Sequence, residues 1–255
     1  ATLLGIKIFI QEQNSYPGIT NKILSRFAKK IFVAYDNLNQ FFKENKIVLT
    51  GNPVRKDITA TLPEKTEALT FFNLKANKKT ILIIGGSLGA RTINESIEKN
   101  IELFAQNEIQ LLWQTGKVYY DGIIDRTKNK DLTDVKIHQF IREMNMAYSA
   151  ADIIISRAGA LSISELCIIG KPTILIPSPN VSEDHQTKNA MALVNKNAAV
   201  LVKDIEAKEK LGNVVLELMK DEIKLNQLSE NIKTLAKANA ANDIVNTITG
   251  EIQKS

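Results

Sequence analysis

The stretch DIIISRAGALSISE, residues 152–165, decides the predicted fold. Ile153, Ile154 and Ile155 form an apolar run that is typical of a buried parallel strand. Gly159 follows among small residues, where a backbone can turn tightly and approach a ligand closely. We place the start of the next helix at Ser162. A strand, a tight turn and a helix N-terminus together form a platform for an anion or a sugar at the carboxyl edge of a sheet.

The same order of strand and helix repeats along most of the chain. Six apolar runs, each followed by a helical or polar segment, lie at 80–84, 109–114, 135–140, 152–156, 173–176 and 200–202. This alternation predicts an α/β fold with a doubly wound parallel sheet and helices on both faces. Shorter runs at 8–10, 31–34 and 47–49 predict the end of a preceding α/β domain, whose earlier strands we expect upstream of Ala1. Only helices are expected after Ile205.

Composition narrows the class of protein. The 255 residues are 44% hydrophobic with a formal charge of +5, and the lysines are scattered. No basic run is interleaved with aromatic residues, so we expect no nucleic-acid partner; an anionic small ligand or membrane surface suits the charge better. The single cysteine, Cys167, excludes a disulfide framework, and we expect it to be buried and inert within a helix. No apolar run approaches the roughly 20 residues of a membrane span.

A glycine-rich segment, GGSLG at residues 85–89, follows the first strand of the large sheet. Its glycines permit positive φ and leave room for backbone amides to face an oxyanion. It is not a Walker A loop, because no Lys-Ser or Lys-Thr follows. The segment is either a loop for a phosphate or sugar nucleotide, or a plain tight turn.

Ser162 and Glu165 support two interpretations. The S-x-x-E spacing matches a capping box, in which Ser162 binds a free amide and Glu165 reaches back. Alternatively, the Glu165 carboxylate accepts hydrogen bonds from two neighbouring ribose hydroxyls, as acidic residues do in nucleotide-binding folds. Local sequence does not separate these two roles.

Other polar residues are also ambiguous. Asp184 can be a helix N-cap, while Gln186 and Asn189 can bind hydroxyls of a sugar. Arg55 can be a solvated charge between domains or a partner for phosphate. No pair of histidines and no Asp-x-Asp motif offers a metal site, so we expect neither a metal ion nor another cofactor.

Five strings together resemble one family. TGNPVR, IIGGSLGA, HQFIREM, ADIIISRAGALSISE and EDHQTKNA, in this order and spacing, are similar to the MurG family of bacterial UDP-N-acetylglucosamine:undecaprenyl-diphospho-muramoyl-pentapeptide N-acetylglucosaminyltransferases. The resemblance runs from about Ile8 to Asn246. It implies the GT-B fold, in which two Rossmann-like domains face each other across a cleft. On this basis we expect a remnant of the N-terminal acceptor-side domain at 1–52, a C-terminal UDP-sugar-binding domain at 53–240, and a helix at 241–255 that returns to the first domain.

The resemblance implies roles on the donor side of that cleft. The backbone of Ile141 would read uracil, and Glu165 would hold the ribose. Ser87 and Arg55 would contact the diphosphate. The loop and helix N-terminus beside the diphosphate and sugar would comprise Ala160, Leu161, Ser162, Ile163 and Ser164.

The resemblance also implies the reaction. N-acetylglucosamine, bound by Gln186 and reached from the other domain by Asn14, would pass with inversion to a lipid-linked muramoyl-pentapeptide. The enzyme would act at the cytoplasmic face of the bacterial inner membrane as a peripheral protein in peptidoglycan synthesis. The general base is expected upstream of Ala1. Gln11 stands where the family often has histidine, so any role of that histidine is in doubt here.

Two other functions remain open at this stage. The early start at Ala1 also suits a donor-binding subunit that is inactive without a separate membrane subunit. A dinucleotide-dependent oxidoreductase would place an acidic residue about 20 positions beyond the Gly85 loop, at the end of the next strand. Glu108 lies near that distance but precedes its strand, which argues against the oxidoreductase.

Overall fold

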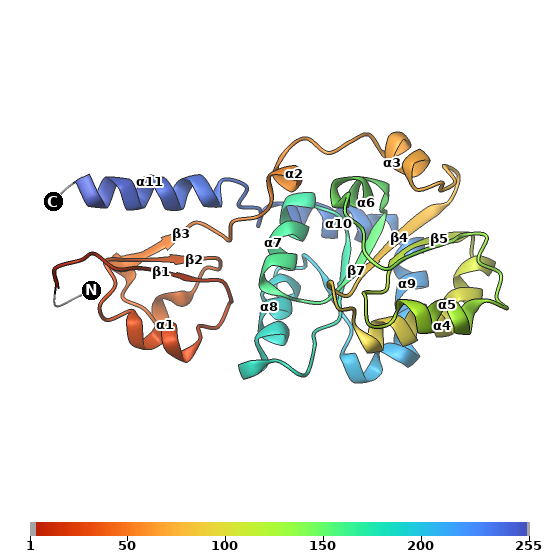
Figure 1. The fold of residues 1–255 in the computed structure, drawn as a ribbon, viewed down its shortest axis with the longest axis horizontal. Helices are drawn as coiled ribbons and strands as arrows, with labels where there is room; N and C mark the ends of the chain where they lie inside the picture. Colours follow the sequence, from red (N-terminus) through yellow and green to blue (C-terminus); the bar gives the residue numbers. More distant parts are fainter. Residues whose placement is uncertain (1–3, 254–255) are drawn as a thin grey trace.

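Two parallel sheets organise the protein (Figure 1). The computed structural model describes residues 4–253, apart from the side chain of Ser182. The smaller sheet has the order β1-β2-β3, and the larger has the order β6-β5-β4-β7-β8-β9. Every strand pair in both sheets is parallel, as the alternation of strands and helices predicts.

The smaller sheet comprises β1 (Phe9–Glu12), β2 (Lys30–Val33) and β3 (Ile47–Leu49). Its own small core includes Ile31 and Phe42. Helix α1 (Ile19–Leu24) follows β1 and leaves apolar side chains exposed: the exposed fractions of Ile19 and Ile23 are 63% and 58%.

The larger sheet comprises β4 (Lys79–Ile84), β5 (Ile109–Gln114), β6 (Val135–His138), β7 (Ile153–Ser156), β8 (Thr173–Leu175) and β9 (Val200–Leu201). The chain runs outward from β4 to β6 and then returns to place β7 on the other side of β4. Strand order therefore reverses between β4 and β7. Crevices outside the carboxyl ends of strands at such a reversal are the usual ligand sites of open α/β sheets.

Helices cover both faces of this sheet, because its central strands are apolar on both sides. Ile81 and Ile83 pack into one core, and Leu82 and Ile154 pack into the other. The helices of this part of the chain are α2 (Lys56–Thr59), α3 (Lys65–Phe71), α4 (Arg91–Gln106), α5 (Tyr120–Thr127), α6 (Met144–Ala150), α7 (Ala160–Ile169), α8 (His185–Val194), α9 (Ala207–Lys220) and α10 (Glu222–Lys233). The doubly wound α/β prediction is confirmed. Within residues 4–253, no helix is both long and apolar enough to span a membrane.

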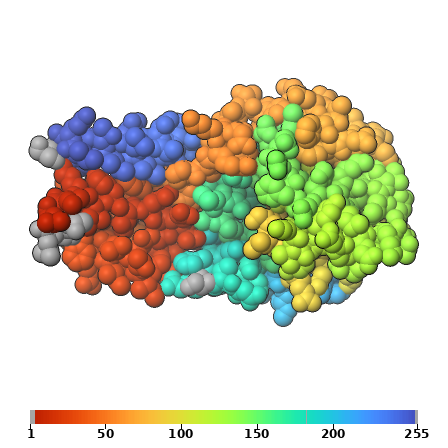
Figure 2. All heavy atoms as spheres, in the orientation of Figure 1, coloured from red at the N-terminus to blue at the C-terminus, as the bar shows by residue number. Residues whose placement is uncertain are grey.

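The C-terminal helix α11 (Ala240–Gln253) lies beside the smaller sheet. Along the long axis of the molecule, it is at the opposite end from β5 (Figure 1). An ion pair of 3.6 Å joins Lys29 Nζ to Glu251 Oε2. In the space-filling view, α11 and the N-terminal residues form one lobe, which abuts the lobe of the larger sheet (Figure 2). The domain boundaries at 52 and 240 remain predictions.

Candidate functional site

A pocket of about 380 Å³ opens at the carboxyl ends of β4 and β7, where the strand order reverses. Its walls come from segments that are far apart in the sequence: the loops after β4, β6 and β7, the end of β5, and helices α6, α7 and α8. It lies within the size range of small-molecule sites, roughly 300–1,000 Å³. The lining residues include Arg55, Ser87, Ile141, Ser162, Glu165 and Gln186.

Helix α7 directs its N-terminus into this pocket. It begins at Ala160 with Gly159 as its N-cap, so Ser162 is the third helical residue and not the first. No described side chain bonds to the cap, and Glu165 has other partners. The capping box is therefore wrong. The first backbone N–H groups of α7 have no intrahelical acceptor, which makes this end of the helix a favourable place for an anion.

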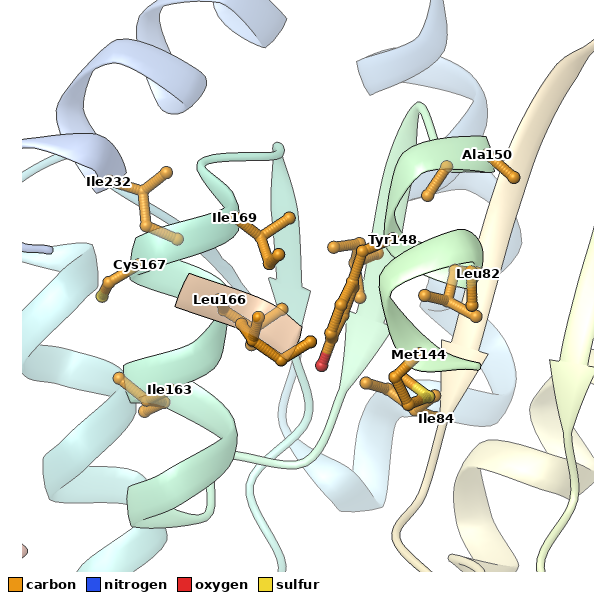
Figure 3. Close-up of a cluster of buried hydrophobic side chains, with 14 of the residues drawn as sticks. Leu82, Ile84, Met144, Tyr148, Ala150, Ile163, Leu166, Cys167, Ile169 and Ile232 are labelled. Atoms are coloured by element: carbon orange, nitrogen blue, oxygen red, sulfur yellow. The ribbon is translucent and has the colours of Figure 1, made fainter. Parts of the chain in front are cut away.

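Glu165 is held from two sides. The buried hydroxyl of Tyr148 donates to Glu165 Oε2 at 2.9 Å, and Arg55 Nε lies 3.5 Å from Glu165 Oε1. Burial, reinforced by the Glu165 charge, raises the pKa of Tyr148 well above its ordinary value, so the hydroxyl remains a donor. Figure 3 shows Tyr148 between α6 and α7. These contacts fix the carboxylate at the pocket wall.

The loop after β4 turns at two glycines with positive φ, Gly86 (+85°) and Gly89 (+88°). A Cβ on Gly89 would lie 2.2 Å from the carbonyl oxygen of Thr115, and a Cβ on Gly116 would lie 2.1 Å from the Gly89 nitrogen. The two backbones therefore pack against each other where no side chain fits. This contact, with the hydrogen bond from Lys117 N to Ser87 O, sets where the loop faces the pocket.

The opposite wall is formed by the loop after β6. Gln114 is buried at the end of β5; its Oε1 accepts from the Ile141 N–H at 2.8 Å, and its Nε2 donates to Gly86 O at 3.3 Å. One amide thus ties the Ile141 loop to the glycine loop. The neighbouring Phe140 is 53% exposed and lines the pocket, where its ring can stack on a flat ligand. Gln114 and Phe140 were missed in the sequence, although Phe140 lies within the string HQFIREM and Gln114 ends the predicted strand at 109–114.

Gln186 and Arg157 complete the wall near α8. Gln186 Oε1 accepts from the Ser178 and Ala158 N–H groups at 2.9 and 3.2 Å. Within the described part of the chain, Nε2 is left as a donor for a ligand. Arg157 was not predicted; it donates to the carbonyl oxygens of Ile176 and Pro177 and pairs with Asp204, so it braces the ends of β7 and β8.

Asn14 lies outside the pocket lining. Its Oδ1 accepts from Asn189 Nδ2 at 3.0 Å, while Asn189 Oδ1 accepts from the Ser15 N–H at 2.8 Å. Asn189, one of the residues weighed for sugar binding, is thus buried and holds the two domains together instead. Of the Asn14 side chain, Nδ2 donates to Glu12 Oε1 at 3.4 Å and keeps a second N–H for other contacts.

Four of the predicted α7 residues also lie outside the lining. Leu161 is 49% exposed, and Ile163 is buried on the other side of the helix. Ser164 Oγ accepts from Asn52 Nδ2 at 3.0 Å and donates to the carbonyl oxygen of Ala160. Among these four residues, Ala160 and Leu161 can still offer their backbone N–H groups, which belong to the first helical turn. Of the five residues predicted at 160–164, Ser162 lines the pocket.

The pocket therefore combines amide N–H groups, a fixed carboxylate, an arginine and an exposed aromatic ring. The ring can stack on a flat base, and the carboxylate can accept from a vicinal diol. The arginine and the amide N–H groups can bind a pyrophosphate. Among residues 4–253, no group of three His, Cys, Asp or Glu side chains is placed to hold a metal ion.

Family models match both parts of the chain. The glycosyltransferase family 28 C-terminal domain matches residues 80–247, and the family 28 N-terminal domain matches residues 1–33. The UDP-N-acetylglucosamine–N-acetylmuramyl-(pentapeptide) pyrophosphoryl-undecaprenol N-acetylglucosamine transferase of Parabacteroides distasonis is 52% identical over 98% of this chain and 68% of its own length. The enzyme of the same name from Cytophaga hutchinsonii is 54% identical over 97% of this chain and 66% of its own length.

A solved structure gives the same grouping. The crystal structure of Acinetobacter baumannii MurG matches with a TM-score of 0.77 and 27% identity, over 97% of this chain and 68% of that one. The chain thus spans about two thirds of the length of these relatives. On the identity and the extent of these matches, the chain belongs to glycosyltransferase family 28 and, within it, to the MurG family.

Proposed function

We propose that the pocket binds UDP-N-acetylglucosamine and that the protein transfers its N-acetylglucosamine to a muramyl-pentapeptide carried on pyrophosphoryl-undecaprenol. The main support is that six of the residues expected to bind the donor line one pocket, although they come from five separate segments of the chain. They are Arg55, Ser87, Ile141, Ser162, Glu165 and Gln186. The reaction is the one printed in the names of relatives that are more than half identical to the chain.

The nucleoside would occupy the side of the pocket between α6 and α7. Glu165 would accept hydrogen bonds from the two ribose hydroxyls, since Tyr148 already fixes the plane of its carboxylate. The base would stack on Phe140. Because the Ile141 N–H is occupied by Gln114, the carbonyl of Ile141 is the backbone group still available, and it would accept from the N3–H of uracil.

The diphosphate would lie against the N-terminus of α7 and the Gly85–Gly89 loop, beside Ser87 and Arg55. In the transfer, the acceptor hydroxyl oxygen bonds to the anomeric carbon and loses its proton. The bond from that carbon to the β-phosphate oxygen breaks, and its electron pair leaves with UDP. The helix dipole, the loop amides and Arg55 would stabilise the charge that develops on the leaving group. Gln186 Nε2 would hold a sugar hydroxyl.

The acceptor substrate indicates where the protein works. The names of the relatives place the acceptor on undecaprenol, a lipid, so we propose that the protein works at a membrane surface as a peripheral protein. We propose that this surface is the cytoplasmic face of the bacterial inner membrane. The cleft between the two lobes would receive the muramyl-pentapeptide headgroup.

The proposal is tested by titrating the 255-residue chain with UDP-N-acetylglucosamine, UDP, CDP and AMP in a calorimeter. UDP-N-acetylglucosamine and UDP should bind at least about tenfold more tightly than CDP, since cytosine lacks the N3–H. AMP should bind more weakly still, because its base is larger and a phosphate is missing. If AMP binds as tightly as UDP, the assignment of the donor is wrong.

Replacing Gln114 with leucine should weaken UDP binding about tenfold, because it leaves the Ile141 N–H buried without a partner and detaches the loop that forms the base wall. The matched control is Gln110→Leu. Gln110 is a buried amide on the same strand that bonds Lys75 and Thr80 at the far end of β5. Calorimetry should show that Gln110→Leu costs stability but leaves UDP affinity unchanged. Equal losses of affinity in both variants would show a general effect of destabilisation.

A further inference from the structure

A second cavity, of about 200 Å³, lies on the other side of α7, between the two domains. The smaller sheet contributes the segments after β2 and β3, and the C-terminal domain contributes α7, α8 and the segment after α10. In Figure 3, Ile163 and Cys167 leave α7 on the side away from Tyr148. Helix α7 is therefore a wall shared by this cavity and the nucleotide pocket. We refer to the space between Tyr35, Ile163, Cys167, Leu193, Leu235 and Lys237 as the hinge cavity.

The hinge cavity contains an unsatisfied donor. The hydroxyl of Tyr35 is buried and has no hydrogen-bond partner among the described residues. Burial raises its pKa, so the group keeps its proton and can donate. Buried hydroxyls without a partner are uncommon in folded proteins, because desolvation without a hydrogen bond costs about 1–3 kcal/mol. A ligand atom or a water in the cavity would remove this cost.

The interior walls are mostly apolar, and two polar lining residues, Asn52 and Ser164, hydrogen-bond to each other. Ile163 and Leu193 are buried there, and Leu235 is partly buried. Burial raises the pKa of the Cys167 thiol to about 12, so it behaves as another neutral wall group. The cavity is smaller than the roughly 300 Å³ at which drug-sized sites begin, so it suits a small molecule with a short apolar body.

The rim is cationic. Lys196 Nζ pairs with Asp36 Oδ2 at 2.7 Å across the domain boundary, whereas Lys237 has no ion-pair partner within residues 4–253. The stem of Lys237 packs against Gly51, where an added Cβ would lie 2.3 Å from Lys237 Cβ. This contact places the base of the Lys237 side chain where the chain passes between the domains. The Tyr35 hydroxyl and the Lys237 ammonium are both donors, and an acceptor-only anionic group complements them.

We propose that the hinge cavity binds a small monocarboxylate with a short apolar tail. The carboxylate lies at Lys237, and the tail lies among Ile163, Leu193 and Leu235. Because the walls come from both domains, the bound molecule holds the N-terminal sheet against α7 and stabilises one interdomain arrangement. The site is thus regulatory: its occupancy changes the arrangement of the two domains that form the cleft. It shares helix α7 with the nucleotide pocket but no lining residue. The proposal does not depend on the identity of the nucleotide.

The test is an NMR titration of the 255-residue chain with sodium octanoate, followed on isotope-labelled isoleucine and leucine methyl groups. We expect saturable shifts at Ile163, Leu193 and Leu235, and the same shifts when UDP is already bound. Octylamine, which has the same tail and the opposite charge, should not produce them. Absence of saturable shifts at millimolar octanoate would overturn the proposal. Equal shifts from octylamine, or shifts mainly at exposed groups such as Ile19, would do the same.

Two variants identify the site. Lys237→Met keeps the stem but removes the charge, and should weaken octanoate binding about tenfold. Lys220→Met, an exposed change at the end of α9, is the matched control and should leave octanoate affinity unchanged. Tyr35→Phe should weaken binding by a smaller factor, because it removes one neutral hydrogen bond. An unchanged octanoate affinity in Lys237→Met would disprove the assignment.

Discussion

Replacing Glu165 with alanine is expected to lower the affinity for UDP about a hundredfold. The carboxylate is placed to accept two ribose hydroxyls, and hydrogen bonds to charged groups contribute about 1.5–3 kcal/mol each. A combined loss of about 3 kcal/mol corresponds to about a hundredfold in Kd. Calorimetric titration of both proteins with UDP measures the effect directly. Tyr148 loses its acceptor in the variant, so unfolding in urea must be followed alongside to separate binding from stability.

A nucleotide that lacks the 2′-hydroxyl makes the Glu165 test specific. Wild-type protein should bind 2′-deoxy-UDP about tenfold more weakly than UDP, while Glu165→Ala should bind the two alike, because the group that recognises the hydroxyl is gone. Tyr148→Phe retains the carboxylate but frees its orientation, and should give an intermediate loss. If Glu165→Ala still discriminates between UDP and 2′-deoxy-UDP as strongly as the wild type, ribose recognition resides elsewhere.

The sheet could be predicted because its information is local. Apolar runs such as Ile81–Ile84 and Ile153–Ile155 are continuous, which requires burial on both faces and so a parallel sheet between two helical layers. The handedness of the crossovers then places helices on both faces and loops at the carboxyl edge, where the ligand platform was expected. The strand order, with its reversal between β4 and β7, was not predicted. The location of a pocket at that reversal needs no side-chain detail.

The start of α7 was misplaced for the opposite reason. Ser162 and Glu165 carry the spacing of a capping box, and nothing nearby in the sequence contradicts it. In the structure, Glu165 bonds instead to Tyr148, 17 residues earlier, and lies near Arg55, 110 residues earlier. With its carboxylate engaged there, the helix extends back to Ala160 under a glycine cap. Tertiary partners of Glu165 exclude the capping box, whereas ribose binding by Glu165 stays a prediction.

Contacts between the domains were invisible for a similar reason. Asn14 and Asn189 are 175 residues apart, and Asn52 and Ser164 are 112 apart. From the sequence, ligand binding was expected of Asn14 and Ser164 and weighed for Asn189, whereas Asn52 was given no role. Their short mutual hydrogen bonds show that part of each motif holds the two domains in register. Motif membership therefore predicts proximity to the cleft more securely than it predicts contact with the ligand.

Gly116→Ala should be the most damaging small substitution near the pocket, with a loss of about 3 kcal/mol in the free energy of unfolding. Gly116 has φ of +82°, and an added Cβ would lie 2.1 Å from the Gly89 nitrogen, so the whole glycine loop must move. Strain at positive φ costs about 1–2 kcal/mol, and overpacking adds about 1–3 kcal/mol. Thermal unfolding should show a decrease in Tm of about 6–12 °C for a chain of this size.

Gly86→Ala separates the two causes of that loss. Gly86 has nearly the same φ, +85°, but nothing lies within 4 Å of an added Cβ. Its alanine variant therefore carries the backbone strain alone, partly offset by the lower entropy of its unfolded chain, and should lose no more than about 1 kcal/mol. The difference between the two variants measures the close approach of the β4 and β5 loops. If both lose the same amount, φ strain accounts for the whole effect, and the packing of Gly116 on Gly89 does not position the loop that faces the pocket.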